Sequence, residues 1–219
     1  MGDPTRHPAL DACPVTPRAD VSARGRARLD AIDNPDAAVR DWKTRLHGYA
    51  FTEAPDDPYI WLSNVLALDA VSRGNYGVGA VIVREADGDV VAEGQNHLLR
   101  PYMRTDHHAE MVAMDRFEDA FRQEDRRGFT LYSSLECCPM CTVRLINGGI
   151  RTVYFAADDD DCGMARFVDR LPAFWRRTAA LREPPQRFER PRCAPLLMDW
   201  AGEIFRSTEQ RLNEIVRQR

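Results

Sequence analysis

The sequence predicts an α/β fold built on a mixed five-stranded sheet, on three observations. Residues 78–84 are an apolar, largely β-branched run, and after the turn signal Asp87-Gly88-Asp89 residues 90–95 return as a second strand, a pattern typical of a β-hairpin. From residue 106 to residue 156, helical and strand patterns alternate, which predicts a right-handed unit with parallel strands. Residues 186–190, between two prolines, supply a fifth strand.

The other elements follow from apolar periodicity and from helix start and stop signals. A charged helical segment comes first and is interrupted by Asn34-Pro35-Asp36, where the proline suits the first turn of a second helix. Thr105 or Asp106 is expected to cap the helix after the hairpin, and Asn147-Gly148-Gly149 to end the next one. Two helices are predicted within residues 21–47, and further helices at 58–71, 106–127, 138–147, 167–181 and 196–217. The two remaining strands are predicted at 129–133 and 151–156.

These elements divide the chain into three parts. Residues 1–56 form an irregular or helical N-terminal extension, and its first 20 residues, which contain four prolines, are an irregular lead-in. Residues 57–181 form the central domain. Residues 182–219 form a strand and a helix that pack on that domain or on a partner subunit.

Composition narrows the class of protein. The chain has 219 residues, 44% of them hydrophobic, which is enough to bury one full core. Its formal net charge is −4, so no overall basic field attracts nucleic acid. There is no apolar run of membrane-spanning or signal-peptide length, and we expect a soluble cytoplasmic protein without membrane contact.

Cysteine usage points to metal chemistry. Three of the six cysteines are crowded at 137, 138 and 141, which indicates a metal site in a reducing compartment and not a disulfide framework. We expect Cys13, Cys162 and Cys193, which are isolated in the sequence, to be inert thiols.

Two short motifs supply the groups that a catalytic zinc site needs. Cys138 and Cys141 are three residues apart, so both sulfurs lie on one face of a helix start, and His108 supplies a third ligand. Such a site also needs an open position for water and a group that moves the proton of that water. Glu110 is not required as a ligand and is the candidate for proton transfer.

Two other interpretations of the cysteines are weaker. A thioredoxin-like redox pair would leave His108-Ala109-Glu110 without a role. A closed structural zinc site would need Cys137 or His107 as a fourth ligand. Cys137 adjoins Cys138 and so points to a different side, and His107 is expected to be an exposed residue at the helix start.

The two motifs together resemble the zinc-dependent cytidine deaminase-like superfamily, in its branch of guanine, cytosine and tRNA-adenosine deaminases. The family pattern is H-A-E followed by E-P-C-P-M-C, and this chain departs from it only at Cys137, where the family has proline. The resemblance implies a three-layer α/β/α sandwich over residues 57–181. It also implies one Zn²⁺ per chain, held by His108, Cys138 and Cys141.

The resemblance also implies an activity, which is hydrolytic deamination of a nucleobase or nucleoside with release of ammonia. Glu110 is then the catalytic residue, and Asn96 and Ala109 contact the substrate. The other interpretation of Asn96 is a residue that ends a strand and caps a loop. A homodimer is the expected assembly.

The sequence favours a small nucleobase or nucleoside over a polynucleotide as substrate, because a basic stripe with stacking aromatic residues is lacking. The alternative is a tRNA adenosine deaminase, which would need a basic groove formed by Arg100, Arg104 and Arg151. The acidic run Asp158–Asp161 is expected to be a solvated turn that repels phosphate. A non-catalytic zinc scaffold is disfavoured because it has no use for Glu110.

Overall fold

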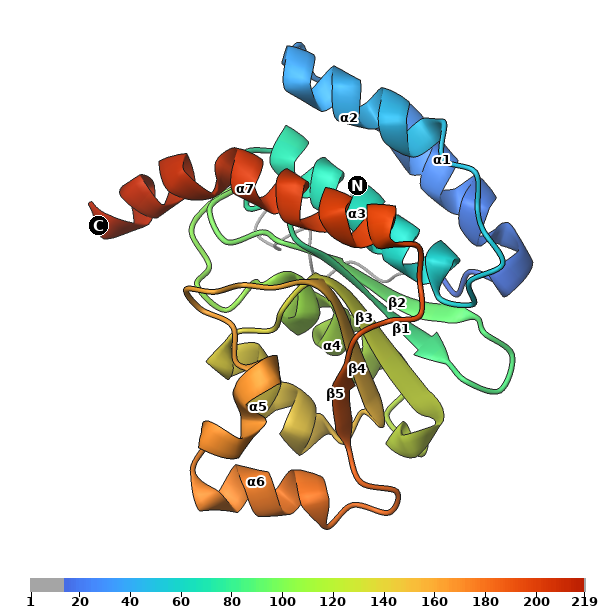
Figure 1. Ribbon diagram of the computed structural model, residues 1–219, viewed down its shortest axis with the longest axis vertical. Coiled ribbons are helices and arrows are strands. Elements are labelled where there is room, and N and C mark those ends of the chain that lie inside the picture. Colours follow the sequence, from blue (N-terminus) through green and yellow to red (C-terminus); the bar gives the residue numbers. More distant parts are fainter. Residues whose placement is uncertain (1–13, 219) are drawn as a thin grey trace.

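The computed structural model of the protein describes residues 14–218. Its five strands form one mixed sheet in the order β2-β1-β3-β4-β5 (Figure 1). β1 pairs antiparallel with β2 and β3, whereas β3, β4 and β5 run parallel. Cys13 and most of the predicted lead-in lie outside the described residues.

Helices cover both faces of the sheet, which confirms the predicted three-layer α/β/α sandwich (Figure 1). α3 and α7 lie on one face and α4 and α5 on the other. The elements are η2 (Arg18–Asp20), α1 (Val21–Ala31), α2 (Ala37–His47), α3 (Asp57–Ser72), β1 (Gly79–Arg84), β2 (Val90–Gln95), α4 (Ala109–Ala120), η3 (Arg126–Gly128), β3 (Phe129–Leu135), α5 (Pro139–Gly148), β4 (Thr152–Ala157), η4 (Ala165–Arg170), α6 (Ala173–Ala180), β5 (Arg187–Glu189) and α7 (Pro195–Arg217).

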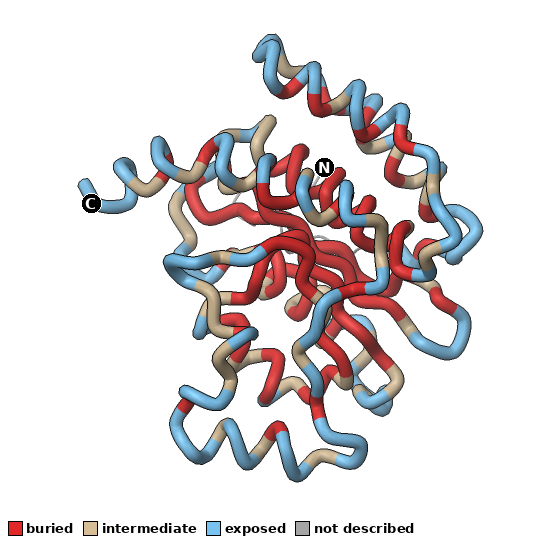
Figure 2. The backbone as a smooth tube through the Cα atoms, in the orientation of Figure 1, coloured by how far each residue is buried: buried red, intermediate tan, exposed pale blue. Residues whose placement is uncertain are grey.

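α3 is the helix around which the outer layers are arranged. Its residues 59–70 are all buried, and a helix that is apolar on every side must be covered on every side (Figure 2). The sheet covers one side, while α7 and the N-terminal helices α1 and α2 cover the rest (Figure 1). Trp61 lies at this contact, and its indole N–H donates to the carbonyl of Leu46 at the end of α2 (2.9 Å).

Two arginines of α1 attach it to the core through three ion pairs. Arg28 contacts Asp69 of α3 at 2.8 Å and Glu93 of β2 at 3.0 Å, and Arg24 contacts Glu93 at 3.1 Å. The side chain of Glu93 is fully buried and that of Asp69 is 3% exposed. Buried carboxylates need such partners, so the N-terminal helices complete the charge balance of the domain.

The boundaries of the elements differ from the prediction in three places. α4 ends at Ala120, short of the predicted end at residue 127. His108, not Thr105 or Asp106, occupies the N-cap position of α4. The predicted helix at 167–181 is divided into η4 and α6, because Pro172 keeps the preceding Leu171 in an extended conformation. Among the described residues, no helix is long and apolar enough to span a membrane.

Candidate metal centre and active site

The first turns of α4 and α5 lie at the same edge of the sheet, and they carry the two motifs. His108 is the N-cap residue of α4, and Cys138 is the N-cap residue of α5 directly after β3. α4 can reach this position because Gly94 of β2 has no side chain. A Cβ there would lie 2.1 Å from the carbonyl oxygen of Ala109. The helix start therefore packs directly on the strand.

The three predicted ligands are brought together. The ligand atoms of His108, Cys138 and Cys141 all lie within 4.8 Å of one another. The Cys138 sulfur is 3.6 Å from His108 Nδ1. One imidazole and two sulfurs in this arrangement fit the ligand set of a catalytic zinc ion, which leaves a fourth position open. These residues are positioned to bind a metal ion.

Glu110 lies next to this ligand set in the first turn of α4. Its side chain is buried, with Oε2 3.6 Å from the Cys141 sulfur. Ser133 of β3 donates a hydrogen bond to Oε1 at 3.4 Å. Burial raises the pKa of the Glu110 carboxyl, which favours a group that both takes up and releases a proton.

The two cysteines of the ligand set differ in their electrostatics. The Cys141 thiol donates a hydrogen bond to the Cys138 sulfur, which lowers the pKa of Cys138 to about 4. Cys138 also lies at the start of α5, where the helix dipole favours an anion. Both effects favour the thiolate of Cys138, the form that binds a metal ion.

Neither proposed fourth ligand belongs to the metal-ligand group found among the described residues. Cys137 is fully buried, and burial together with the nearby Glu110 carboxylate raises the pKa of its thiol. His107 is 1% exposed, so the prediction that it is an exposed residue is wrong. The loop before α4 folds over it, since the backbone N–H of His97 donates to the His107 carbonyl at 2.9 Å.

A cavity of about 560 Å³ opens above the metal-ligand group. Its floor includes His108, Glu110 and Cys138. Asn96, at the end of β2, also lines it, and its side-chain oxygen accepts the backbone N–H of Leu98 at 3.0 Å. Ala109 is fully buried between α4 and β2 and is not among the residues lining this cavity.

The other side of the cavity is a wall that sequence reasoning did not identify residue by residue. It comes from the segment after β4 and from the C-terminal half of α7. Tyr76, before β1, stacks on Phe205 of α7 with 6.3 Å between ring centroids. The wall residues are Tyr76, Asp159, Asp161, Cys162, Phe205, Glu209, Asn213, Val216 and Arg217.

A periodic signal for the α7 part of this wall is present in the sequence. Phe205, Glu209 and Asn213 are spaced by four residues, and Val216 and Arg217 continue the same stripe. The stripe combines polar and apolar side chains on one helix face. Hydrophobic periodicity alone therefore does not reveal it.

The arginines proposed for a basic groove do not meet at the cavity. Arg104 pairs with Asp106 at 2.8 Å, and Arg151 pairs with Glu85 at 2.7 Å. None of Arg100, Arg104 and Arg151 is among the described residues that line the cavity. Its wall is mainly acidic and aromatic.

Comparisons with known proteins agree with this geometry. Residues 56–157 match the sequence model of the family described as the cytidine and deoxycytidylate deaminase zinc-binding region. The guanine deaminase and the tRNA-specific adenosine deaminase of Bacillus subtilis are 35% and 34% identical over 105 and 108 residues, 48% and 49% of this chain. These matches span 65% of the length of each relative.

Two further relatives extend the comparison. The tRNA-specific adenosine deaminase of Agrobacterium fabrum is 33% identical over 105 residues, which are 48% of this chain and 67% of that protein. A solved structure of guanine deaminase from Nitrosomonas europaea is 20% identical with a TM-score of 0.55, covering 75% of this chain and 90% of that one. At this identity it supports the fold alone. The chain belongs to the zinc-binding cytidine deaminase-like superfamily.

Proposed function

We propose that the protein catalyses hydrolytic deamination of a small nucleobase or nucleoside, converting an amino group to an oxo group with release of ammonia. The observation that carries this proposal is the position of Glu110. Its buried carboxyl lies beside the metal-ligand group, at the floor of a cavity large enough for a heterocyclic base. A structural metal site would not place a proton carrier there.

The roles of the residues follow from their positions. Zinc held by His108, Cys138 and Cys141 would supply Lewis acidity that makes water a nucleophile at neutral pH. Glu110 would take up the proton of the attacking water and deliver it first to the ring and then to the departing amine. Its raised pKa suits both steps.

Substrate orientation is assigned to the upper part of the cavity. Asn96 can donate its amide N–H to the edge of a base, because its oxygen accepts the backbone N–H of Leu98. Ala109 would act through its backbone at the start of α4, as the family resemblance implies. The rings of Tyr76 and Phe205 offer an apolar surface for a planar heterocycle.

The charge of the wall supports a substrate without phosphate. Asp159, Asp161 and Glu209 line the cavity. Burial raises the pKa of Asp159 and of Glu209. Repulsion adds to the shift, from Glu136 and Asp161 at Asp159 and from Asp159 and Asp161 at Glu209. The three carboxylates of the wall disfavour a tRNA or nucleotide phosphate and outnumber the one arginine among the described wall residues, Arg217. Guanine is a candidate substrate because one relative is a guanine deaminase. Cytosine, adenine and the nucleosides are the other compounds to test.

The test is ammonia release by zinc-loaded protein over guanine, cytosine, adenine and their nucleosides. Glu110→Gln is the control, because it keeps the shape of the side chain and removes its proton-carrying role. Turnover of one compound that disappears in this variant, while zinc stays bound, supports the proposal. Inosine formation in tRNA, with no turnover of any small compound, would replace it with the tRNA alternative.

A further inference from the structure

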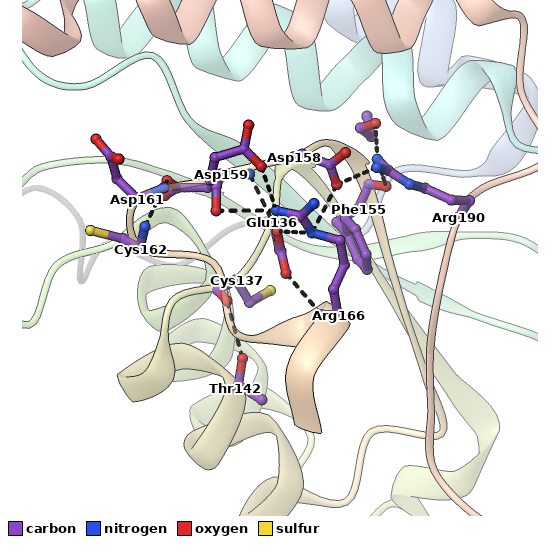
Figure 3. A network of polar contacts seen from close by, with 12 residues as sticks. Glu136, Cys137, Thr142, Phe155, Asp158, Asp159, Asp161, Cys162, Arg166 and Arg190 are labelled. Carbon is purple, nitrogen blue, oxygen red and sulfur yellow. Dashed lines mark hydrogen bonds and ion pairs between the residues drawn. The ribbon is translucent and has the colours of Figure 1, made fainter. Parts of the chain in front are cut away.

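The acidic segment Asp158–Asp161 is not a simple solvated turn, because its residues alternate between two environments. Asp158 and Asp160 point to Arg166, with contacts of 3.1 Å to Nε and 2.9 Å to Nη2 (Figure 3 shows the Asp158 contact). Asp159 and Asp161 instead line the cavity. Asp158 also pairs with Arg190, so Arg166 holds Asp160 alone and Asp158 together with Arg190, and neither carboxylate lines the cavity.

Glu136 joins Arg166 to the motif of the second metal-binding helix. Its side chain is fully buried and lies 2.7 Å from Arg166 Nε (Figure 3). The same carboxylate accepts the backbone N–H of Arg166 at 2.8 Å and that of Asp159 at 3.3 Å. One buried group therefore holds both ends of the segment between residues 159 and 166.

The segment wraps closely around this carboxylate. A Cβ at Gly163 would lie 2.2 Å from Glu136 Oε2 and 2.4 Å from the carbonyl oxygen of Asp159. The backbone N–H of Met164 donates to the carbonyl of Cys137 at 2.9 Å. Any side chain at residue 163 would displace the segment from the cavity edge.

We propose that Arg166 is a positioning residue for substrate binding. Through Glu136 and through Asp158 and Asp160, it holds residues 159–162 in place as one wall of the cavity. Arg166 lies beyond residue 157, where the match to the family ends, so the arrangement links the family's metal-binding motif to a segment outside that match. This proposal rests on the proposed function and assigns a residue that sets affinity at the same site.

The first test compares Arg166→Met with Arg166→Lys and with the control Arg127→Met. Arg127 is an exposed arginine paired with Asp125 at 2.6 Å, before the start of β3 and so at the opposite end of the strand from Glu136. For the compound found by ammonia release, Arg166→Met should raise KM by roughly tenfold or more, with kcat within about threefold and zinc content unchanged. Arg166→Lys should recover part of the loss, because lysine keeps the charge but not the forked geometry.

A double-mutant cycle separates positioning from general stability. If Arg166 acts by holding the wall residues in position, Arg166→Met should raise KM only slightly in a protein that already carries Asp161→Asn. The expected result is that the two effects on KM are clearly less than additive. Fully additive effects, or a loss in kcat with KM unchanged, would overturn the proposal.

Hydrogen exchange tests the arrangement without any substrate. The backbone amides of residues 159–166 should exchange at least about tenfold faster in Arg166→Met and in Gly163→Ala, while β3 and α5 keep their protection. If the panel yields no substrate, the proposed function fails, and this measurement alone decides on Arg166. Equal exchange in the variant and in the unaltered protein would then overturn the positioning role.

Discussion

The floor and the wall of the cavity differ in origin and in burial. The floor groups, His108, Glu110, Cys138 and Cys141, come from helix starts that pack on the central strands, and they fall within residues 56–157. The wall comes mostly from residues 159–162 and 205–217, which lie outside that match.

Burial follows the same division. Glu110 is 3% exposed and Cys141 is fully buried, whereas α7 becomes largely exposed towards its C-terminal end (Figure 2). From this difference we infer that the floor sets the reaction type, while affinity and substrate choice depend on wall segments that lie outside the family match. Substitutions in the floor should therefore affect zinc binding and kcat, and substitutions in the wall should affect KM.

The largest effect is expected from removing a metal ligand. Cys138→Ser should lower zinc well below one ion per chain and reduce turnover to background, because a serine hydroxyl does not replace a thiolate on zinc. Elemental analysis with ammonia release measures both. Cys162→Ser is the matched control, since Cys162 also lines the cavity but is not in the ligand group, and it should keep its zinc. Full zinc content in Cys138→Ser would show that the ligand assignment is wrong.

A smaller effect, of the opposite kind, is expected at the wall. Phe205→Ala removes the ring that stacks on Tyr76 and should raise KM by roughly tenfold, with kcat and zinc content nearly unchanged. Steady-state kinetics on the identified substrate gives both constants. Ile215→Ala, an exposed position of the same helix, is the control and should behave as the unaltered protein. A fall in kcat alone would mean that the wall takes part in the chemistry.

The N-terminal helices α1 and α2 lie away from the cavity, so a substitution there should change stability and not catalysis. Arg28→Met tests this. It leaves Asp69 and Glu93 without their Arg28 contacts, which should lower the free energy of unfolding by about 3 kcal/mol, while KM and kcat stay within about twofold. Urea denaturation measures the loss. The control is Arg45→Met, which removes a half-exposed ion pair with Asp41.

The loss of stability in Arg28→Met should depend on pH, and the pKa of Asp69 gives the direction. Burial alone would raise the pKa of Asp69, but the hydrogen bond and charge of Arg73 and the charge of Arg28 outweigh it and lower the pKa. The contribution of the pair is therefore complete above the unfolded-state pKa of about 3.9 and is lost as pH falls through the lower folded-state value. The stability difference between Arg28→Met and the unaltered protein should shrink below about pH 4. A constant difference down to about pH 2 would exclude this carboxylate as the cause.

The smallest effect is expected at the one departure from the family motif. Cys137 lies outside the metal-ligand group and precedes the N-cap of α5, so proline fits its position. Cys137→Pro should keep one zinc ion per chain and change kcat by no more than about threefold, because it removes no member of the metal-ligand group. Loss of zinc in this variant would make Cys137 a ligand.

The floor could be predicted from the sequence because its chemistry is local. Cys138 and Cys141 share one helix turn, and the strand before them begins with aromatic and aliphatic side chains, so short-range patterns determine their placement. The approach of His108 to them needed only the crossover rule for alternating helices and strands.

The wall could not be predicted because it depends on where distant elements meet. Asp161 and Glu209 are 48 residues apart, and only the path of α7 across the sheet brings both to the cavity. The burial of His107 likewise depends on the loop that packs on it and not on its neighbours in sequence. The break before α6 is a different case, since Leu171-Pro172 carries the signal for it.

The complete burial of α3 has a consequence for how the molecule can be divided. A fragment starting at residue 56, where the family match begins, would uncover Trp61 and remove the arginine partners of Glu93. Its newly exposed apolar surface would favour self-association over folding. The unit inherited from the family is therefore shorter than the unit that folds, and recombinant expression should retain the N-terminal helices from Val21 onward.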